Sequence, residues 1–434
     1  MDNNQPPSQL PEKVLHRHAE LLSELLPDFS RLVFEEGRPA DALLNRFLRN
    51  HRELGSRDRR FLSQAVFSFF RWYGWTVGKL GLSPSEACFV GTALDTAELP
   101  PSFLYLQKQF DLPEVAPIGD QSLTEKRDAL SEWFKDAAGT QPLALTDLLP
   151  EDAAGVIDPD SIERCVTSFQ ERPPVWIRSR ADARELMHVL DEQQIPASIH
   201  PHLPSAMSLE AGLNLTSVLN KHAGQYIVQD ISSQCVGLAC APAPGEDWWD
   251  CCAGAGGKAL HLMDLMQQDG KVLATDVRNE ALKELKKRAR HHGIRNIRTQ
   301  PFNAVNDEPF RKTFDGVLVD APCSGWGTWG RNPDARWRTS RKEVTQCANR
   351  QQKILNNATW CVKPGGVLVY AVCTVTRPET EEVVMNFLDH HTNFKLAPFI
   401  NPLTGEQTDG QLQIWPWDGP GDAMFIARFR RTED

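Results

Sequence analysis

The segment GEDWWDCCAGAGGKALHLMDLM, residues 245–266, decides the fold of this chain. It begins as a short apolar strand that ends at Asp250, continues through a glycine-rich turn, and finishes as a helix. The helix is expected to turn Leu260, Met263, Leu265 and Met266 toward a sheet. Glycines let the backbone approach a ligand without Cβ clashes, and the first turn of a helix offers unpaired N–H groups. The segment therefore predicts a cofactor site built from Cys252, Ala253, Gly254, Ala255, Gly256, Gly257 and Lys258.

The next predicted strand, KVLATD at 271–276, ends in Asp276. A carboxylate at that point of a parallel sheet is placed to bind both hydroxyls of a ribose. The turn does not have the spacing G-x-G-x-x-G, and Lys258 is followed by Ala259 rather than Ser or Thr. Both facts disfavour a nicotinamide cofactor or ATP. The glycine turn and Asp276 alone leave a dinucleotide and S-adenosylmethionine open.

Length and charge limit what these motifs can mean. A chain of 434 residues, 41% of them hydrophobic, has material for two or three globular domains. Residues 83–169 hold 16 acidic and 5 basic side chains, a charge of −11, against −10 for the whole chain, so the remainder sums to +1. An acidic segment thus masks a near-neutral remainder, and a polyanionic partner is not excluded.

The ten cysteines show no Cys-x-x-Cys spacing, so the sequence predicts no metal site. Nothing at the start resembles a secretory signal, and no apolar run approaches the roughly eighteen residues of a membrane helix. We expect a cytoplasmic monomer that does not contact a membrane, with free thiols.

Periodicity divides the chain into regions of different character. The first 80 residues are helical, and SRDRRFLSQAVFSFFRWYGW at 56–75 carries the broad apolar stripe of a buried helix face. A strand at 175–178 and a following helix indicate a small α/β unit, beyond which strands and helices alternate as in a parallel sheet. We expect a disordered tail at 1–12, a helical domain at 13–168, a small α/β unit at 169–235 and an α/β Rossmann-like domain at 236–434.

Two cysteines are predicted at the same sheet edge. The apolar strand 315–319 leads into DAPCSGWG, so Cys323 follows a strand end, and Cys373 follows the apolar strand 367–372. The carboxyl edge of a parallel sheet is where ligands bind in such folds. Both thiols are therefore expected to face the cofactor cleft.

These motifs together resemble the Sun-type, RsmB-like RNA cytosine-5 methyltransferases. The resemblance covers about residues 170–434 and rests on VQDISSQ at 228–234, DCCAGAGGK at 250–258, ATD at 274–276, DAPCSGWG at 320–327, VYAVCT at 369–374 and GDAMFIARFRR near the end. The helical start resembles the NusB-like domain of many such bacterial enzymes. The resemblance implies S-adenosylmethionine as cofactor and RNA, ribosomal RNA in particular, as substrate.

The resemblance also assigns roles that the chemistry asks for. Carbon 5 of cytosine is too electron-poor to attack a sulfonium methyl group until a nucleophile has added to carbon 6, and a thiolate suits that addition. By the match, Cys373 is the nucleophile, Cys323 assists its release, and Asp320 binds ring nitrogen 3. Lys258 is the nearest candidate cation to favour the thiolate.

Three positions depart from the family pattern. Gly254-Ala255 stands where Ala-Pro is usual, Ala371-Val372 where Ser-Thr is usual, and Asn303 where an aspartate meets the adenine. An asparagine can still bind the adenine amino group through its carbonyl oxygen. These departures leave open a catalytically degenerate fold that acts as an RNA-binding ribosome-assembly factor. Cytosine methylation in DNA is disfavoured because the chain has no Pro-Cys-Gln motif.

Two basic segments are candidates for contact with RNA phosphates. One is the helix RNEALKELKKRARHHGIRNIR at 278–298, whose charges we expect to form a solvated outer face. The other, GRNPDARWRTSRK at 330–342, follows Cys323 and lies in a segment that also holds Trp326, Trp329 and Trp337. We expect this second segment to be a substrate loop beside the cleft.

Overall fold

A computed structural model describes residues 10–109, 114–135, 142–151 and 153–433 of the chain. Residues 1–9 of the expected tail lie outside this range. The chain divides into two compact units. The first takes in residues 1–155, 159–171 and 332–340, and the second residues 156–158, 172–331 and 341–434.

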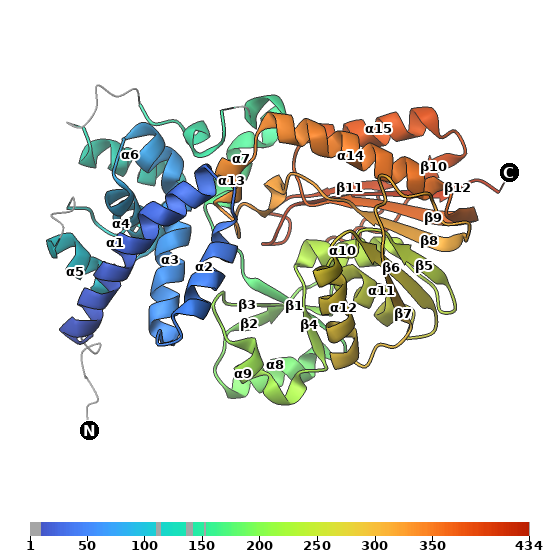
Figure 1. Cartoon of the computed structure of the whole chain (residues 1–434), viewed down its shortest axis with the longest axis horizontal. Coiled ribbons are helices and arrows are strands. Elements are labelled where there is room, and N and C mark those ends of the chain that lie inside the picture. Colours follow the sequence, from blue (N-terminus) through green and yellow to red (C-terminus); the bar gives the residue numbers. More distant parts are fainter. Residues whose placement is uncertain (1–9, 110–113, 136–141, 152, 434) are drawn as a thin grey trace. The chain divides into compact units, whose positions relative to one another are not determined.

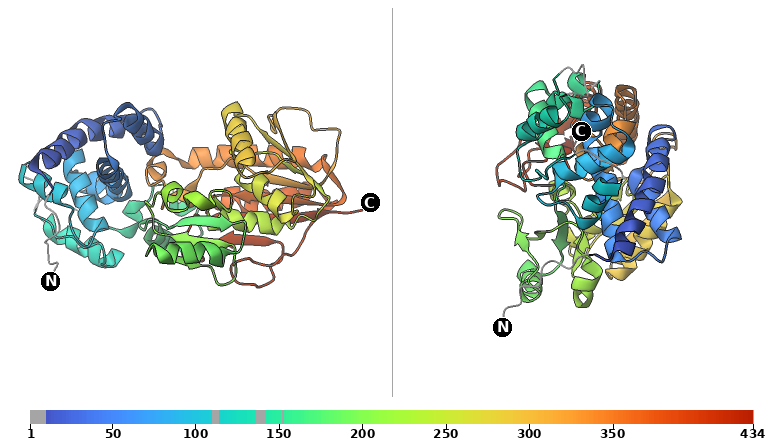
Figure 2. Two further views of the ribbon diagram at one scale, coloured as in Figure 1. Left: turned by 90° about the horizontal axis from the view of Figure 1, so that it is seen from below. Right: turned by 90° about the vertical axis from the view of Figure 1, so that its left-hand side faces the viewer.

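The first unit is helical, with no strand in its described part (Figure 2). Its main helices are α1 (Glu12–Phe34), α2 (Ala40–Asn50), α3 (Ser56–Tyr73), α4 (Pro84–Asp95), α5 (Pro101–Gln109), α6 (Leu123–Trp133), α7 (Ile162–Phe169) and α13 (Ala335–Arg338). Its short turns are η1 (Gly74–Lys79), η2 (Leu145–Leu148), η3 (Ala153–Gly155) and η4 (Pro159–Ser161). The apolar stripe predicted for α3 is confirmed, because its members are all buried: Phe61, Leu62, Ala65, Val66, Phe69 and Phe70. Whether this unit is NusB-like stays a prediction.

The segment 332–340 packs within the helical unit, although more than 150 positions in the sequence separate it from the rest of that unit. The guanidinium of Arg336 is fully buried and donates to the carbonyl oxygens of Leu148 (2.9 Å) and Phe169 (3.1 Å). The indole N–H of Trp337 donates to the carbonyl oxygen of Phe70 at 2.6 Å. These two side chains are structural parts of the unit.

The prediction of a substrate loop is therefore wrong for most of its residues. Trp326 and Trp329, which lie in the second unit, are fully buried with ring centroids 4.7 Å apart. A buried indole has no free face for a base, and a guanidinium committed to carbonyl oxygens is not available to a phosphate. Among the basic residues of the segment, only Arg341 and Lys342 at its end are exposed as that prediction requires.

The second unit contains a small antiparallel sheet with strand order β2-β3-β1-β4. Its elements are β1 (Val175–Ser179), α8 (Ala183–Glu192), β2 (Ala197–Ile199), β3 (Ala206–Leu209), α9 (Leu215–Val218), η5 (Asn220–His222) and β4 (Tyr226–Val228). The predicted strand at 175–178 and the helix after it are confirmed, and Asp182 caps α8 by accepting from Arg184 N. The apolar side of α8 packs on the sheet through Leu186 and Leu190. RNA binding by this sheet stays a prediction.

The large sheet of the second unit has the order β10-β12-β9-β8-β5-β6-β7, with β11 paired to β12. Its strands are β5 (Asp247–Asp250), β6 (Lys271–Asp276), β7 (Ile297–Pro301), β8 (Phe314–Asp320), β9 (Val362–Val372), β10 (Phe394–Leu396), β11 (Gln411–Ile414) and β12 (Met424–Arg431). The five strands from β9 to β7 are parallel, whereas β12 runs antiparallel to its partners. The expected α/β class with a mostly parallel sheet is confirmed.

Helices cover both faces of this sheet (Figure 1). One layer holds α10 (Ile231–Cys240), α11 (Gly257–Leu265) and α12 (Asn279–His291), and the other holds α14 (Arg341–Thr359) and α15 (Glu381–His390). Strands covered on both sides read as continuous apolar runs, as in β8, where Leu318 joins one core and Val317 and Val319 the other. In α11, Leu260, Met263 and Met266 are buried in the core as predicted, together with Ala259 and Leu262. Leu265 is only half-buried, so the prediction for Leu265 is wrong.

No helix in the described part of the chain combines the length and the apolar character that crossing a bilayer requires.

Candidate active site

The glycine turn, residues 251–257, connects β5 to α11 at the carboxyl edge of the sheet. Backbone bonds fix it to the neighbouring strand, since Ala253 N donates to the carbonyl oxygen of Thr275 at 2.8 Å. Gly256 caps α11 with φ +86°, and a Cβ there would overlap the side chain of Leu285. Gly257 has open space where its Cβ would be. One glycine therefore permits packing against α12, and the other leaves room for a ligand.

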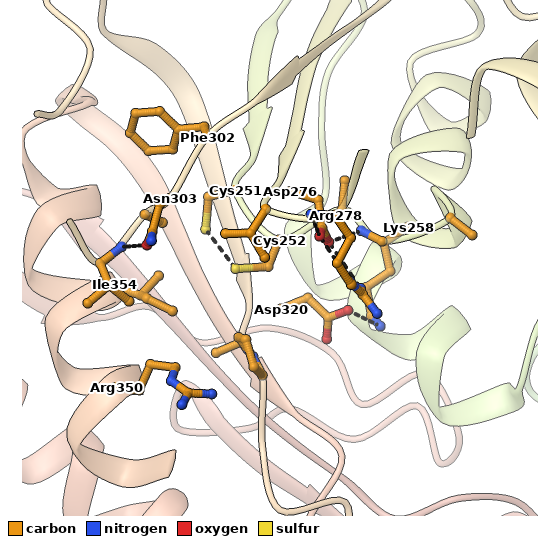
Figure 3. Close-up of a pocket in the computed structure, with 18 of the residues that line it drawn as sticks. Cys251, Cys252, Lys258, Asp276, Arg278, Phe302, Asn303, Asp320, Arg350 and Ile354 are labelled. Atoms are coloured by element: carbon orange, nitrogen blue, oxygen red, sulfur yellow. Dashed lines mark hydrogen bonds and ion pairs between the residues drawn. The ribbon is translucent and has the colours of Figure 1, made fainter. Parts of the chain in front are cut away.

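A cavity of about 880 Å³ opens beside this turn (Figure 3). Most of the expected cofactor residues line it: Cys252, Ala253, Gly254, Ala255, Gly257, Lys258, Asp276, Asn303 and Asp320. Gly256 is not among the lining residues because it faces Leu285 instead. The cavity is of a size that suits a nucleoside-type cofactor.

Asp276 already accepts four hydrogen bonds. Its oxygens receive the backbone N–H groups of Gly254 (2.9 Å) and Arg278 (2.8 Å), and the Arg278 guanidinium at 3.0 and 3.1 Å. Burial acts to raise the pKa of this carboxyl, but the bonds from Arg278 lower it below its ordinary value. The Arg278 side chain is 69% exposed and can swing away. The carboxylate can bind ribose hydroxyls once its hydrogen bonds with the Arg278 guanidinium are broken.

Asn303 lies across the cavity and holds an internal turn. Its Oδ1 accepts from Val305 N at 3.1 Å, and its own N–H donates to Asp307 Oδ2 at 2.6 Å. The backbone N–H of Val305 thus competes with an adenine amino group for this oxygen. The Nδ2 group of the same amide can instead donate to a ring nitrogen.

Lys258 and Asp320 form an ion pair at the mouth of the thiol site, with Nζ 2.7 Å from Oδ2. Burial acts to lower the pKa of Lys258, but the charge of Asp320 and its hydrogen bond raise it above the ordinary value. The ammonium also lies close enough to Cys373 for the two to interact electrostatically. This ion pair joins the first turn of α11, which holds Lys258, to the end of β8, which holds Asp320.

Cys323 and Cys373 are the thiol pair. Their Sγ atoms lie 3.1 Å apart, and both side chains are half-buried. Strands β8 and β9 are parallel neighbours, so the residues just past their ends meet at one edge. The hydrogen bond with Cys373 and burial raise the pKa of Cys323 well above its ordinary value. The prediction that both thiols lie at one sheet edge is confirmed, but neither Cys323 nor Cys373 is among the residues that line the cavity, so their facing the cofactor stays a prediction.

Several residues of this region were not singled out in the sequence. The lining of the cavity includes Val277, Arg278, Phe302, Arg350 and Ile354. Val277 directly follows Asp276 and is 63% exposed, an unusual state for a valine at a strand end. The position of Val277 directly after an acidic strand end was the one feature of the sequence that could have pointed to it. Arg350 and Ile354 lie on α14, and no local sequence pattern shows that this helix reaches the cavity.

The lining fits S-adenosylmethionine. Asp276 offers a partner for the ribose hydroxyls. Val277, which is exposed, and Phe302, which is buried, offer apolar contact for a base. Gly257 leaves space for the chain that carries the sulfonium. With the sheet order and the two helical layers, this site places the second unit in the class of S-adenosylmethionine-dependent methyltransferases.

Comparison with known proteins supports the family resemblance. Residues 237–430 match the family described as 16S rRNA methyltransferase RsmB/F, which confirms the Sun-type, RsmB-like resemblance. Ribosomal RNA small subunit methyltransferase B of Cronobacter sakazakii is 31% identical over 280 residues, 62% of each chain. Its probable counterpart in Synechocystis is 33% identical over 278 residues, 61% of each chain. The chain thus spans about three fifths of the length of these relatives.

Solved structures agree on the fold. The protein PH0851 has a TM-score of 0.72 at 24% identity, covering 98% of this chain and all of its own. NSun6 from Pyrococcus horikoshii, solved with SFG, has a TM-score of 0.58 at 16% identity and covers 66% of this chain and 99% of its own. At these identities the likeness shows the fold alone.

Proposed function

We propose that this chain transfers a methyl group from S-adenosylmethionine to carbon 5 of a cytosine in ribosomal RNA. The observation that carries the proposal is the thiol pair, 3.1 Å apart, next to the Lys258–Asp320 ion pair and the cofactor cavity. The family and the names of the relatives support ribosomal RNA as the substrate. The pair of thiols supports carbon 5 of cytosine, because that carbon needs a covalent activator.

Cys373 attacks carbon 6 as a thiolate. The new C6–S bond sends an electron pair toward carbon 5, which then takes the methyl group. S-adenosylmethionine supplies that methyl group as an electrophile. The proton on carbon 5 leaves to a base, the C6–S bond breaks, and its electrons return to Cys373. Cys323 assists this release, as the family resemblance implies.

Lys258 and Asp320 prepare the two reactants. The Lys258 ammonium favours the thiolate of Cys373 by its charge. A proton shared between Asp320 and ring nitrogen 3 offsets the charge that collects on that nitrogen after attack on carbon 6. Since Lys258 holds one oxygen of Asp320, the carboxyl group keeps a fixed orientation with its other oxygen toward the base.

Cys323 holds its proton in the resting site. The hydrogen bond with Cys373 and burial raise its pKa, which favours the protonated thiol. A thiol that donates to the attacking sulfur stabilises that sulfur before attack and again when it leaves. The two cysteines therefore have unequal roles.

Hydroxyl groups remain near the nucleophile in this chain. Ala371 and Val372 are buried apolar residues of β9. The hydroxyls of Ser324 and Thr374, which directly follow the two cysteines, lie 3.1 Å from each other. The departure at Ala371-Val372 is thus compatible with activity and weakens the case for a degenerate scaffold.

The test is methyl transfer to unmodified 16S ribosomal RNA, with the purified chain and S-adenosylmethionine labelled in the methyl group. The expected product is 5-methylcytidine in the digested nucleosides. Bisulfite sequencing of RNA from a deletion strain beside its parent then locates the cytosine. Label in another nucleoside would refute carbon 5, and binding of RNA without transfer would favour the assembly-factor alternative.

A further inference from the structure

Glu379 is a fully buried carboxyl group beneath the thiol pair. It ends the short turn η7 (Arg377–Glu379) that precedes α15. No lysine or arginine of the described residues forms an ion pair with it within 4.0 Å. A buried carboxyl group is stable only when hydrogen bonds replace the water that it has lost.

Four donors supply those bonds, and they come from three segments of the chain. Ser324 donates to Glu379 through its backbone N–H (2.9 Å) and its hydroxyl (2.5 Å). The hydroxyl of Thr376 donates at 2.7 Å and the amide of Gln351 at 2.8 Å. The hydroxyl of Thr374 lies 3.3 Å from the same carboxyl oxygen as the hydroxyls of Ser324 and Thr376.

Two of the hydroxyl groups at Glu379 belong to residues next to the two thiols in the sequence. Ser324 directly follows Cys323, and Thr374 directly follows Cys373. One carboxyl group therefore binds the loop after β8 and the loop after β9 at the same time. The two loops are also joined directly, because Gly327 N donates to the carbonyl oxygen of Cys373 at 3.1 Å, and the carboxyl group adds a shared partner that helps to set their separation.

A second set of bonds immobilises the carboxyl group itself. The amide of Gln351 on α14 also donates to the carbonyl oxygen of Pro322 at 3.0 Å. The hydroxyl of Tyr370, inside β9, donates to the carbonyl oxygen of Glu379 at 2.6 Å. Because strand, helix and turn all hold it, Glu379 cannot shift without moving both loops.

We propose that Glu379 is a positioning residue that holds the sulfur atoms of Cys323 and Cys373 at the separation that methyl transfer requires. The inference rests on the proposed function for its role in catalysis. The clamp itself, five hydrogen bonds and contacts from one buried side chain, is independent of that function.

The charge of Glu379 has a second effect, on the pKa of Cys323. The pKa of Cys323 is raised chiefly by its hydrogen bond with Cys373, then by burial and by the charge of Cys373. The charge of Glu379 raises it further. It thereby helps to keep the proton on the thiol that assists release. Removing the clamp and removing the charge are separable by choice of substitution.

Glu379→Gln and Glu379→Ala separate these effects. Glutamine keeps the shape and still bonds the loops, since the hydroxyls of Ser324 and Thr376 can rotate to accept from its NH₂ group. Alanine removes the clamp. We expect Glu379→Ala to lower kcat by about 10- to 100-fold with KM for S-adenosylmethionine unchanged, the usual cost of misplacing reacting groups by about 1 Å. Glu379→Gln should restore most of kcat and move alkylation of Cys323 by iodoacetamide to lower pH.

Asp95→Asn is the matched control. Asp95 is also a largely buried carboxyl group with three side-chain donors, Ser68, Arg71 and Trp72, but it belongs to the helical unit. This variant should lower the melting temperature and leave kcat of the folded protein unchanged. If Glu379→Ala does not fold, Ser324→Ala, which removes one hydroxyl of the clamp, carries the test in its place.

A second measurement does not depend on methyl transfer. Diamide, a diazene oxidant, takes two electrons and two protons from a pair of thiols and leaves a disulfide. We expect it to join Cys323 to Cys373 more slowly in Glu379→Ala than in the wild type and Glu379→Gln. Equal rates in all three, with kcat reduced no more than stability loss explains, would overturn the inference. Absence of methyl transfer in the wild type would refute the proposed function alone, because the disulfide rates still report on the clamp.

Discussion

Cys323 Sγ lies 3.1 Å from Cys373 Sγ, although fifty positions separate these residues in the chain. The contact exists because β8 and β9 are parallel neighbours that end at the same edge. One thiol of such a pair can serve as nucleophile while the other carries a proton. The contact with Cys373 and burial raise the pKa of Cys323, which fits the proposed role of this thiol as the one that carries the proton.

Trapping of RNA tests these roles. Cys323→Ala should accumulate a covalent protein–RNA complex, because the nucleophile is intact and release is impaired. The complex should survive denaturing electrophoresis, disappear after RNase treatment, and need S-adenosylmethionine to reach its methylated form. Cys373→Ala and the double variant should form none and transfer no methyl group. A complex in Cys373→Ala but not in Cys323→Ala would exchange the two assignments.

Cofactor binding should respond in opposite directions to two neighbouring substitutions. Asp276→Ala removes the ribose partner and should weaken S-adenosylmethionine binding by about 1.5–3 kcal/mol for each lost charge-assisted hydrogen bond. Arg278→Ala frees the same carboxylate from an exposed ion pair and should strengthen binding by about two- to fivefold. Isothermal titration calorimetry measures both. Equal weakening in the two variants would mean that Arg278 contacts the cofactor and does not compete with it.

Asp320→Asn should slow the chemical step. An amide cannot share a proton with ring nitrogen 3 as a carboxyl group does, so we expect kcat to fall by about 100- to 1000-fold with cofactor affinity nearly unchanged. Single-turnover methyl transfer is the measurement. Asp315→Asn is the control, because Asp315 lies near the other end of β8, pairs with Lys363 and does not line the cavity. A small effect of Asp320→Asn would remove this carboxylate from the proposed mechanism.

Asp250 should make stability depend on pH. Burial, followed by the charge of Asp320, raises its pKa from 3.8 to about 8. Between these values the folded protein holds a proton that the unfolded chain releases. Stability is therefore highest at low pH and declines as the pH rises toward 8, by up to about 1.4 kcal/mol per pH unit for one proton. Urea unfolding of Asp250→Asn at several pH values should show a flatter dependence than the wild type, and parallel curves would contradict the assignment.

The segment 330–342 should divide into structural and RNA-binding parts. Arg336→Met should destabilise the helical unit, because burial and the charge of Arg71 already lower the pKa of Arg336 to about 9, and its carbonyl partners would lose their donor. Arg341→Gln with Lys342→Gln should leave stability unchanged, weaken RNA binding, and lower the salt dependence by about one phosphate contact each. Filter binding at several salt concentrations distinguishes the two. Unchanged RNA affinity in the double variant would show that this surface does not contact RNA.

The sequence by itself determined the local elements and the chemistry at strand ends. The glycine turn before Lys258, the acidic end of the strand at Asp276 and the cysteines after two apolar strands are short-range patterns, and parallel strands bring their carboxyl ends to one edge. The family resemblance then gave the order of roles. These features needed no knowledge of how distant segments pack.

Only the tertiary structure decided which polar groups are free and which are already occupied. Asp276 is engaged by Arg278, Arg336 is buried among carbonyl oxygens, and Trp326 and Trp329 fill a core, so composition alone misjudged three of these four as RNA contacts. Glu379 looks in the sequence like any acidic residue before a helix, yet it binds both cysteine loops. Burial and hydrogen-bond partners depend on segments far apart in the chain, and no local pattern records which segments those are.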